Sequence, residues 1–104
     1  MKYVFISQPM NGLNDNQIKI NRNELVEYAK REYGVDVQII DSFFEGAPHH
    51  KKPIWFLGKS IEKLADAEVI IMGEGWESAR GCKIEHDVAK AYGIEVDYYR
   101  GVQK

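Results

Sequence analysis

The sequence predicts an α/β fold in which a parallel four-stranded sheet lies between two layers of helices. Segments rich in apolar and β-branched residues alternate with segments whose apolar residues recur every three or four positions. The segment Val69–Met72 is apolar throughout, which is typical of a central strand covered on both faces. This alternation favours parallel strands that are joined by right-handed helical crossovers.

The first third of the chain predicts a strand followed by a helix. The strand covers Tyr3–Ser7, a short run of apolar and aromatic residues. The helix begins at Asn14 or Asp15, whose side chains can accept hydrogen bonds from its first N–H groups. Gly34 then provides the stop. The apolar face of this helix consists of Ile18, Leu25, Val26, Ala29 and Tyr33.

A second strand is predicted over residues 35–40, and a loop over residues 41–52 follows it. Pro53 suits the first turn of a second helix, because the N–H that proline lacks has no partner in that turn. The buried stripe of this second helix is predicted to consist of Ile54, Leu57, Ile61 and Leu64.

The last third predicts a strand over residues 68–72, a glycine-rich loop over 73–81, a helix over 81–92 and a strand over 94–98. The inward residues of this third helix are predicted to be Ile84, Val88 and Ala91. A central third strand gives the order 2-1-3-4, a three-layer Rossmann- or flavodoxin-like sandwich. Ligands in such sheets bind at the carboxyl ends of the strands, beside the point where the winding direction switches. We therefore expect a pocket between residues 7–12 and 73–81.

Length and composition predict one ordinary globular domain, residues 1–104, with a single core. The chain is 44% hydrophobic and 29% charged, and its net charge is −2. No strong field therefore attracts nucleic acid or an anionic membrane. The sequence also has no apolar run near the length of about 20 residues that a membrane span needs. The single cysteine, Cys82, excludes an internal disulfide framework and favours a cytoplasmic location.

The glycine-rich loop and the helix start that follows it form the first candidate site. Glycines let a ligand approach the backbone closely, and free N–H groups at a helix start can bind a phosphate or another anion. Trp76 could stack on a flat ring. Glu85 is predicted at the edge of the core, about 100° round the helix from Ile84. Its carboxylate is a candidate nucleophile or general base. The alternative is a solvated side chain that favours the helix dipole.

Other segments offer weaker chemistry. The loop of residues 7–12 is either a ligand loop or a polar turn with Pro and Gly as breakers. Cys82 and His86 have a spacing that metal ligands use, but no second ligand pair accompanies them, so we predict no metal site. The cluster of His49, His50, Lys51 and Lys52 is either a solvated loop face or a phosphate contact. Asp41 and Ser42 either contact a ribose hydroxyl or form a turn.

Three segments together resemble the nucleoside 2-deoxyribosyltransferase superfamily, through a small bacterial and phage branch. They are residues 5–12 (FISQPMNG), 64–72 (LADAEVIIM) and 81–94 (GCKIEHDVAKAYGI). The most specific parts are the Pro-Met-Asn-Gly loop and residues 75–86 (GWESARGCKIEH). The resemblance extends over nearly the whole chain.

The resemblance implies a reaction and a site. In those enzymes a glutamate attacks the anomeric carbon of a deoxynucleoside and displaces the base, and a second base or water then takes the sugar. Glu85 matches that glutamate, and the first loop matches the segment that lines the sugar and phosphate. Two-step displacement through an oxocarbenium-like transition state is chemically reasonable. Members often complete the site from a neighbouring subunit, which implies a homo-oligomer.

The sequence departs from those enzymes at a few positions. They often carry Tyr and a Gly-containing turn in the first loop, where this chain has Phe5 and Gln8. The aspartate that protonates the leaving base is matched by residues 58–59, which contain no carboxylate. A polar residue six positions before the nucleophile is matched by Ala79, next to Ser78. The candidates to replace the missing acid are Asp41, Glu45 and Glu77.

The leading hypothesis is therefore an N-glycosidic-bond enzyme, a deoxyribosyltransferase or an N-glycoside hydrolase, with Glu85 as its nucleophile and no cofactor. The alternatives are a non-catalytic protein that binds a nucleotide or a nucleotide-derived signal, and a purely structural or assembly role. The expected partner is a nucleoside or nucleotide. The candidate substrate-binding residues are Ser7, Gln8, Pro9, Met10, Gly12, Asp41, Gly75, Trp76, Ser78, Arg80 and Gly81.

Overall fold

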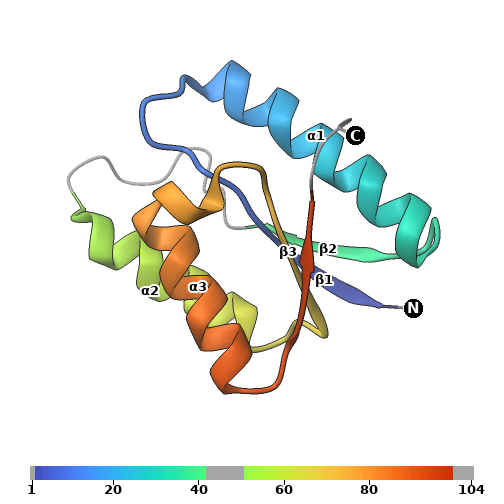
Figure 1. Ribbon diagram of the computed structural model, residues 1–104. Coiled ribbons are helices and arrows are strands. Elements are labelled where there is room, and N and C mark those ends of the chain that lie inside the picture. The colour runs from blue at the N-terminus through green and yellow to red at the C-terminus, as the bar shows by residue number, and fades with distance from the viewer. Residues whose placement is uncertain (1, 42–50, 100–104) are drawn as a thin grey trace.

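A computed structural model describes residues 2–41 and 51–99 and confirms the predicted three-layer α/β architecture (Figure 1). Its four strands pair in parallel in the predicted order β2-β1-β3-β4. The strands are β1 (Tyr3–Ser7), β2 (Gln38–Asp41), β3 (Val69–Met72) and β4 (Glu95–Tyr98). The two central strands are buried because helices cover both of their faces, which explains why Val69–Met72 is apolar throughout.

The helices divide between the two faces of the sheet. Helix α1 (Asp15–Tyr33) covers one face, whereas α2 (Pro53–Leu64) and α3 (Arg80–Ala91) cover the other (Figure 1). A short 3-10 helix, η1 (Trp76–Ser78), lies within the predicted loop between β3 and α3. The side chain of Asn14 caps α1 by accepting a hydrogen bond from the Gln17 N–H. Gly34, at a φ of 106°, ends α1 as predicted.

Strand register places alternate residues on opposite faces of the sheet. Ser7, Met72 and Tyr98 are paired neighbours on β1, β3 and β4, at the carboxyl ends of these strands. Their side chains all point to the α2–α3 face, because side chains with the same register in paired strands share a face. The polar Ser7 and Tyr98 thus lie on either side of Met72, beneath α3.

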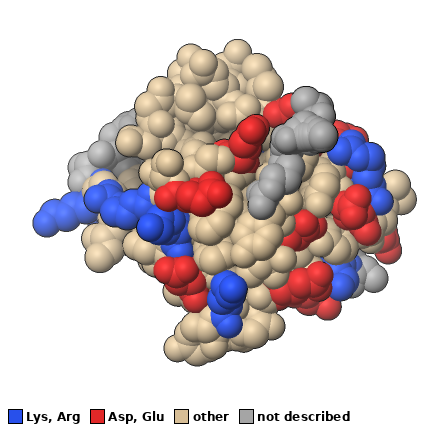
Figure 2. Space-filling view, in the orientation of Figure 1, with Lys and Arg blue, Asp and Glu red and all other residues tan. Residues whose placement is uncertain are grey.

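The face shown in Figure 2 carries acidic and basic side chains that are interspersed. Interspersed charges of both signs agree with the small net charge of −2. Among the helices in residues 2–41 and 51–99, none combines the length and the apolar character that crossing a membrane requires.

The second strand begins later than the sequence predicts. The predicted strand started at Val35, but β2 starts at Gln38, and the side chain of Val35 is 87% exposed. The Val37 N–H donates to the Gly34 carbonyl, so the chain turns once before it can pair with β1. Asp41, which was predicted to begin the loop, is instead the last residue of β2 and pairs with Ile6.

The predicted inward faces of two helices are wrong in part. In α3, Ile84 is 38% exposed and Ala91 is exposed, whereas the buried positions are Cys82, Glu85, His86 and Ala89. In α2, Ile54 is exposed and Ser60 is buried beside Leu64. The prediction assumed that apolar side chains face inward. Ser7 and Tyr98 at the sheet end supply hydrogen bonds that let α3 bury polar side chains there instead.

On the opposite face, the carboxylate of Asp97 joins α1 to the edge strand β4. Its two oxygens accept hydrogen bonds from the hydroxyls of Tyr28, at 2.9 Å, and Tyr33, at 2.6 Å. Burial, followed by the hydrogen bond to Asp97, raises the pKa of Tyr28 from 10.0 to about 12. The same two causes raise the pKa of Tyr33 further. Both hydroxyls therefore stay protonated well above neutral pH.

We expect Gly73→Ala to destabilise the protein by about 1–3 kcal/mol. A Cβ at position 73 would lie 3.2 Å from the Ser7 carbonyl oxygen and 3.3 Å from the Gln8 Cα, which are backbone atoms that cannot easily move. Gly58→Ala is the matched control, because nothing lies within 4 Å of its added Cβ. In the exposed interior of α2 it should stabilise by about 0.5–1 kcal/mol. Urea unfolding measures both, and equal effects would contradict the close approach at Gly73.

We also expect the protein to lose stability as pH rises from 10 towards 12. The unfolded tyrosines ionise near 10.0, whereas Tyr28 in the folded protein ionises only near 12, so rising pH favours unfolding across this range. A Tyr28→Phe, Tyr33→Phe double variant should lose less stability across the same range. Urea midpoints at pH 9 to 12 test this, with the exposed Tyr92→Phe as control. Parallel pH curves for the double variant and wild type would contradict it.

Candidate functional site

The two predicted loops meet at the carboxyl end of the sheet. The Gly73 N–H donates to the Ser7 carbonyl over 2.7 Å, directly after β1 and β3 end. Gly75, at a φ of 86°, lies opposite Pro9, whose Cγ would be 3.7 Å from a Cβ on Gly75. Glycine is needed at position 75 because other residues rarely adopt this left-handed conformation. The two loops are therefore neighbours at these positions, and the ligand pocket expected between them stays a prediction.

A buried carboxyl group lies beneath this junction. Ser7 Oγ, at the end of β1, donates a hydrogen bond of 2.5 Å to Glu85 Oε1 on α3. The Ser60 side chain on α2 is a second hydrogen-bond partner of Glu85. Glu85 is only 5% exposed, so it is buried more deeply than the predicted edge of the core, and the alternative of a solvated side chain is wrong. Three elements that are distant in sequence therefore hold one carboxyl group.

Burial and hydrogen bonding act in opposite directions on the pKa of Glu85. Burial is the larger influence and raises this pKa above 4.5, because the ionised form loses its hydration. Hydrogen bonds from Ser7 and Ser60 lower the pKa, since they stabilise the carboxylate. A carboxylate that is poorly hydrated and held in one orientation is suited to act as a nucleophile or a base.

Cys82 lies one turn before Glu85 and faces the same cluster. Burial raises the pKa of its thiol to about 11. A hydrogen bond with Ser7 lowers this pKa, whereas the nearby charge of Glu85 raises it. The thiol therefore stays protonated at neutral pH and is a poor nucleophile.

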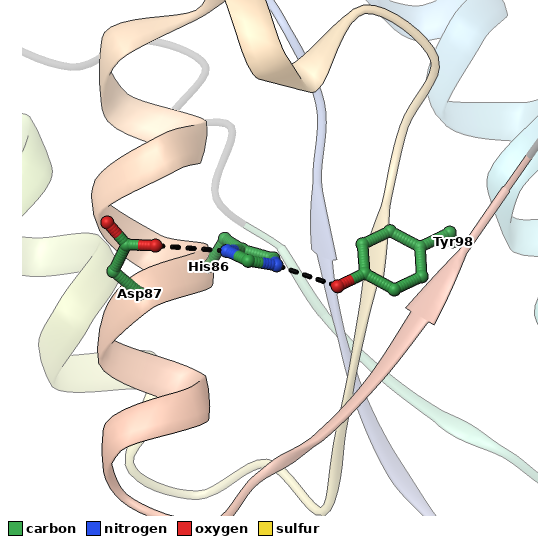
Figure 3. Close-up of polar contacts among 3 residues, drawn as sticks. All are labelled: His86, Asp87 and Tyr98. Atoms are coloured by element: carbon green, nitrogen blue, oxygen red, sulfur yellow. Dashed lines mark hydrogen bonds and ion pairs between the residues drawn. The ribbon is translucent and has the colours of Figure 1, made fainter.

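His86, which follows Glu85 in α3, points toward Tyr98 on β4 (Figure 3). Its Nε2 lies 2.8 Å from the Tyr98 hydroxyl oxygen, and its Nδ1 lies 3.1 Å from Asp87 Oδ1. The indole of Trp76 stacks on the imidazole, with 4.2 Å between ring centroids. Successive residues of a helix point in directions about 100° apart around its axis, so Glu85 reaches β1 while His86 reaches β4.

The Cys82–His86 pair does not converge on one point. Cys82 faces Ser7 and Glu85, whereas His86 is bound to Tyr98 and Asp87. Within residues 2–41 and 51–99, no three His, Cys, Asp or Glu side chains are grouped so that they could hold a metal ion.

The other predicted binding residues differ in their surroundings. The buried amide of Gln8 donates from Nε2 to the Ile18 carbonyl over 3.0 Å and thereby ties the first loop to α1. Asp41 pairs with Ile6 on the far side of β1 from β3. Pro9, Met10 and Gly81 are half-buried, whereas Gly12, Ser78, Arg80 and the acid candidate Glu77 are exposed. Ser42, Glu45, His49 and His50 lie outside the described residues.

Ser60 is the site residue that the sequence analysis missed. It lies four residues before Leu64, within the apolar stripe of α2. A serine in such a stripe is a signal for a buried hydrogen-bond partner on a neighbouring element. Tyr98 carries a weaker signal, since only the strand register shows that it lies level with Ser7.

We expect Glu85→Gln to be more stable than the wild type at neutral pH. Because folding raises the pKa of Glu85 above 4.5, the buried carboxyl stabilises the fold below pH 4.5, and this contribution is lost as pH rises. Glutamine carries no charge, so its advantage should appear between acid and neutral pH. Thermal midpoints from pH 4 to 8 measure this, with the exposed Glu74→Gln as control. A constant difference between Glu85→Gln and wild type at every pH would contradict it.

A known protein family matches this chain over a range that includes both loops and all four strands. Residues 2–98 match the family model described as Domain of unknown function (DUF4406). No curated protein sequence matches the chain. Because the match extends over nearly all 104 residues, this chain belongs to the DUF4406 family.

Proposed function

We propose that this protein acts on the N-glycosidic bond of a nucleoside or nucleotide, as a deoxyribosyltransferase or an N-glycoside hydrolase, with Glu85 as its nucleophile. The observation that carries the proposal is the buried Glu85 carboxyl, which Ser7 and Ser60 hold at the junction of the two loops. This position is the carboxyl edge of a parallel sheet beside its switch point, where α/β proteins bind ligands. The resemblance to nucleoside 2-deoxyribosyltransferases supports the same role for Glu85.

In the proposed reaction, a Glu85 oxygen attacks the anomeric carbon and forms an ester bond to the sugar. The C–N bond breaks, and its electron pair goes to the base nitrogen, which takes up a proton. Water or a second base then attacks the same carbon and releases the Glu85 carboxylate. Ser7 holds Oε1 and so fixes the plane of the carboxylate during both steps.

Helix α2 contains the positions that match the acid which protonates the leaving base in the characterised enzymes. Gly58 and Lys59, which match the aspartate of the characterised enzymes, are exposed, and Lys59 pairs with Glu62 at 3.6 Å. The next residue, Ser60, is the one that faces Glu85. In the described part of α2, the inward polar group is therefore a hydroxyl and not a carboxylate. The base proton comes from another group or from water in this proposal.

A second candidate is a protein that binds a nucleotide, or a signal derived from one, without turnover. The observation that favours it is the burial of Glu85, which disfavours the ionised form that a nucleophile needs. Binding without turnover predicts a raised thermal midpoint with a nucleoside or nucleotide and no free base.

The proposed partner is a small molecule, and the protein is proposed to be a cytoplasmic homo-oligomer. The interspersed charges in Figure 2 support a small-molecule partner more than nucleic acid, which selects a continuous basic surface. The single cysteine, Cys82, supports a reducing compartment.

We expect Glu85→Gln to lower the rate of base release by about 10³-fold or more, because it removes the attacking carboxylate. Ser7→Ala should lower the rate by about 10- to 100-fold, since it removes a hydrogen bond to a charged group. Glu74→Gln, an exposed change in the same loop, should leave the rate unchanged. Chromatography of nucleoside and nucleotide mixtures measures free base and base exchange. Undiminished release by Glu85→Gln would rule out the nucleophile.

A further inference from the structure

Stacking, and not a hydrogen bond, fixes the indole ring of Trp76. The planes of the Trp76 and His86 rings lie 25° apart, with their centroids separated by 4.2 Å. The indole N–H is buried and has no hydrogen-bond partner. Tyr98 adds a tilted ring contact at 5.8 Å. The orientation of Trp76 therefore depends on its ring contacts and on packing against the core, and the stacked imidazole is the nearest of the aromatic rings around it.

His86 is in turn fixed from two sides. Its Nδ1 is held by Asp87 on the same helix, and its Nε2 is held by Tyr98 on β4 (Figure 3). The side chain of His86 is 11% exposed, and both ring nitrogens are engaged. Rotation of the ring would break both contacts, so the imidazole provides a fixed support for Trp76.

The supported ring lies where a ligand could reach it. Trp76 begins η1, directly after Gly75, which faces Pro9 of the first loop. The side chain of Trp76 is half-buried, so part of it remains open to solvent. Its support, His86, is the neighbour of Glu85 in α3. Trp76 thus lies beside the junction of the two loops, on the same face of the sheet as the buried carboxyl.

We propose that His86 is the positioning residue that holds Trp76 as the stacking surface for the planar heteroaromatic ring of the ligand. Flat rings stack on aromatic side chains whatever their hydrogen-bonding pattern. The Trp76–His86–Tyr98 group therefore recognises the base as a ring, while Ser7 and Glu85 serve the sugar. This inference rests on the proposed function for the identity of the ring as a nucleobase.

Tryptophan fluorescence provides the test, because the chain has only two tryptophans. Trp55→Phe leaves Trp76 as the only tryptophan, and its emission is recorded with excitation that avoids the six tyrosines. The probes are 2′-deoxyadenosine, adenine and 2-deoxyribose 5-phosphate, of which the last has no planar ring. Saturable changes in emission with the first two, and none with the third, are expected in the Trp55→Phe protein.

Variants of the support then separate positioning from general packing. In the Trp55→Phe background, His86→Ala should weaken adenine binding by about three- to tenfold, the effect of losing one aromatic pair. His86→Phe keeps a flat ring and should restore most of that loss. Tyr98→Phe removes only the hydroxyl that holds Nε2 and should weaken binding less than His86→Ala does. Tyr92→Phe, an exposed change at the end of α3, should have no effect.

Two results would overturn this inference. One is the absence of any saturable change in Trp76 emission with adenine and deoxyadenosine. The other is unchanged adenine affinity in His86→Ala or, should that variant fail to fold by circular dichroism, in Tyr98→Phe. Base release measured on the same proteins separates this failure from failure of the proposed function. If these variants release base with an unchanged KM, only the role of His86 is rejected. If adenine binding depends on His86 but no base is released, only the catalytic proposal is rejected.

Discussion

The hydrogen bond between Ser7 and Glu85 determines how the rest of this molecule is arranged around its site. It joins the end of β1 to α3 across 78 positions of sequence and sets which face of α3 is buried. It also offsets part of the free-energy cost of placing a carboxylate in the core, because burial alone would favour the neutral acid. A buried charge of this kind lowers stability, and functional sites are where proteins tolerate such a cost.

The two loops approach each other closely beside this hydrogen bond. β1 and β3 end together at the Ser7–Met72 pair, and Gly73 can follow so closely because it has no Cβ to meet the Ser7 carbonyl. Beyond this point, consecutive residues of α3 diverge around Met72. Glu85 contacts β1, and His86 contacts β4, where it supports Trp76. One helix turn therefore serves both the buried acid and the aromatic group.

Hydrophobic patterning was sufficient to predict the fold but not the interior of the site. Strand order and layering follow from the alternation of elements and from the apolar Val69–Met72, and both are confirmed. The rotation of α3 was mispredicted because Ile84 was assumed to face inward, whereas polar Glu85 and His86 do so. Their burial depends on Ser7, Ser60 and Tyr98, which come from three other elements. No pattern within one segment of the sequence predicts these hydrogen-bond partners, because they meet only when the sheet has formed.

We propose that Glu85 forms a covalent bond to the sugar, and mass spectrometry during turnover can detect that bond. The protein is mixed with 2′-deoxynucleosides, quenched with acid and digested, and its peptides are weighed. An ester-linked pentose on the peptide that contains Glu85, absent from Glu85→Gln, is the predicted result. Base release with an unmodified Glu85 peptide, or with a pentose on another residue, would contradict the role of Glu85 as nucleophile.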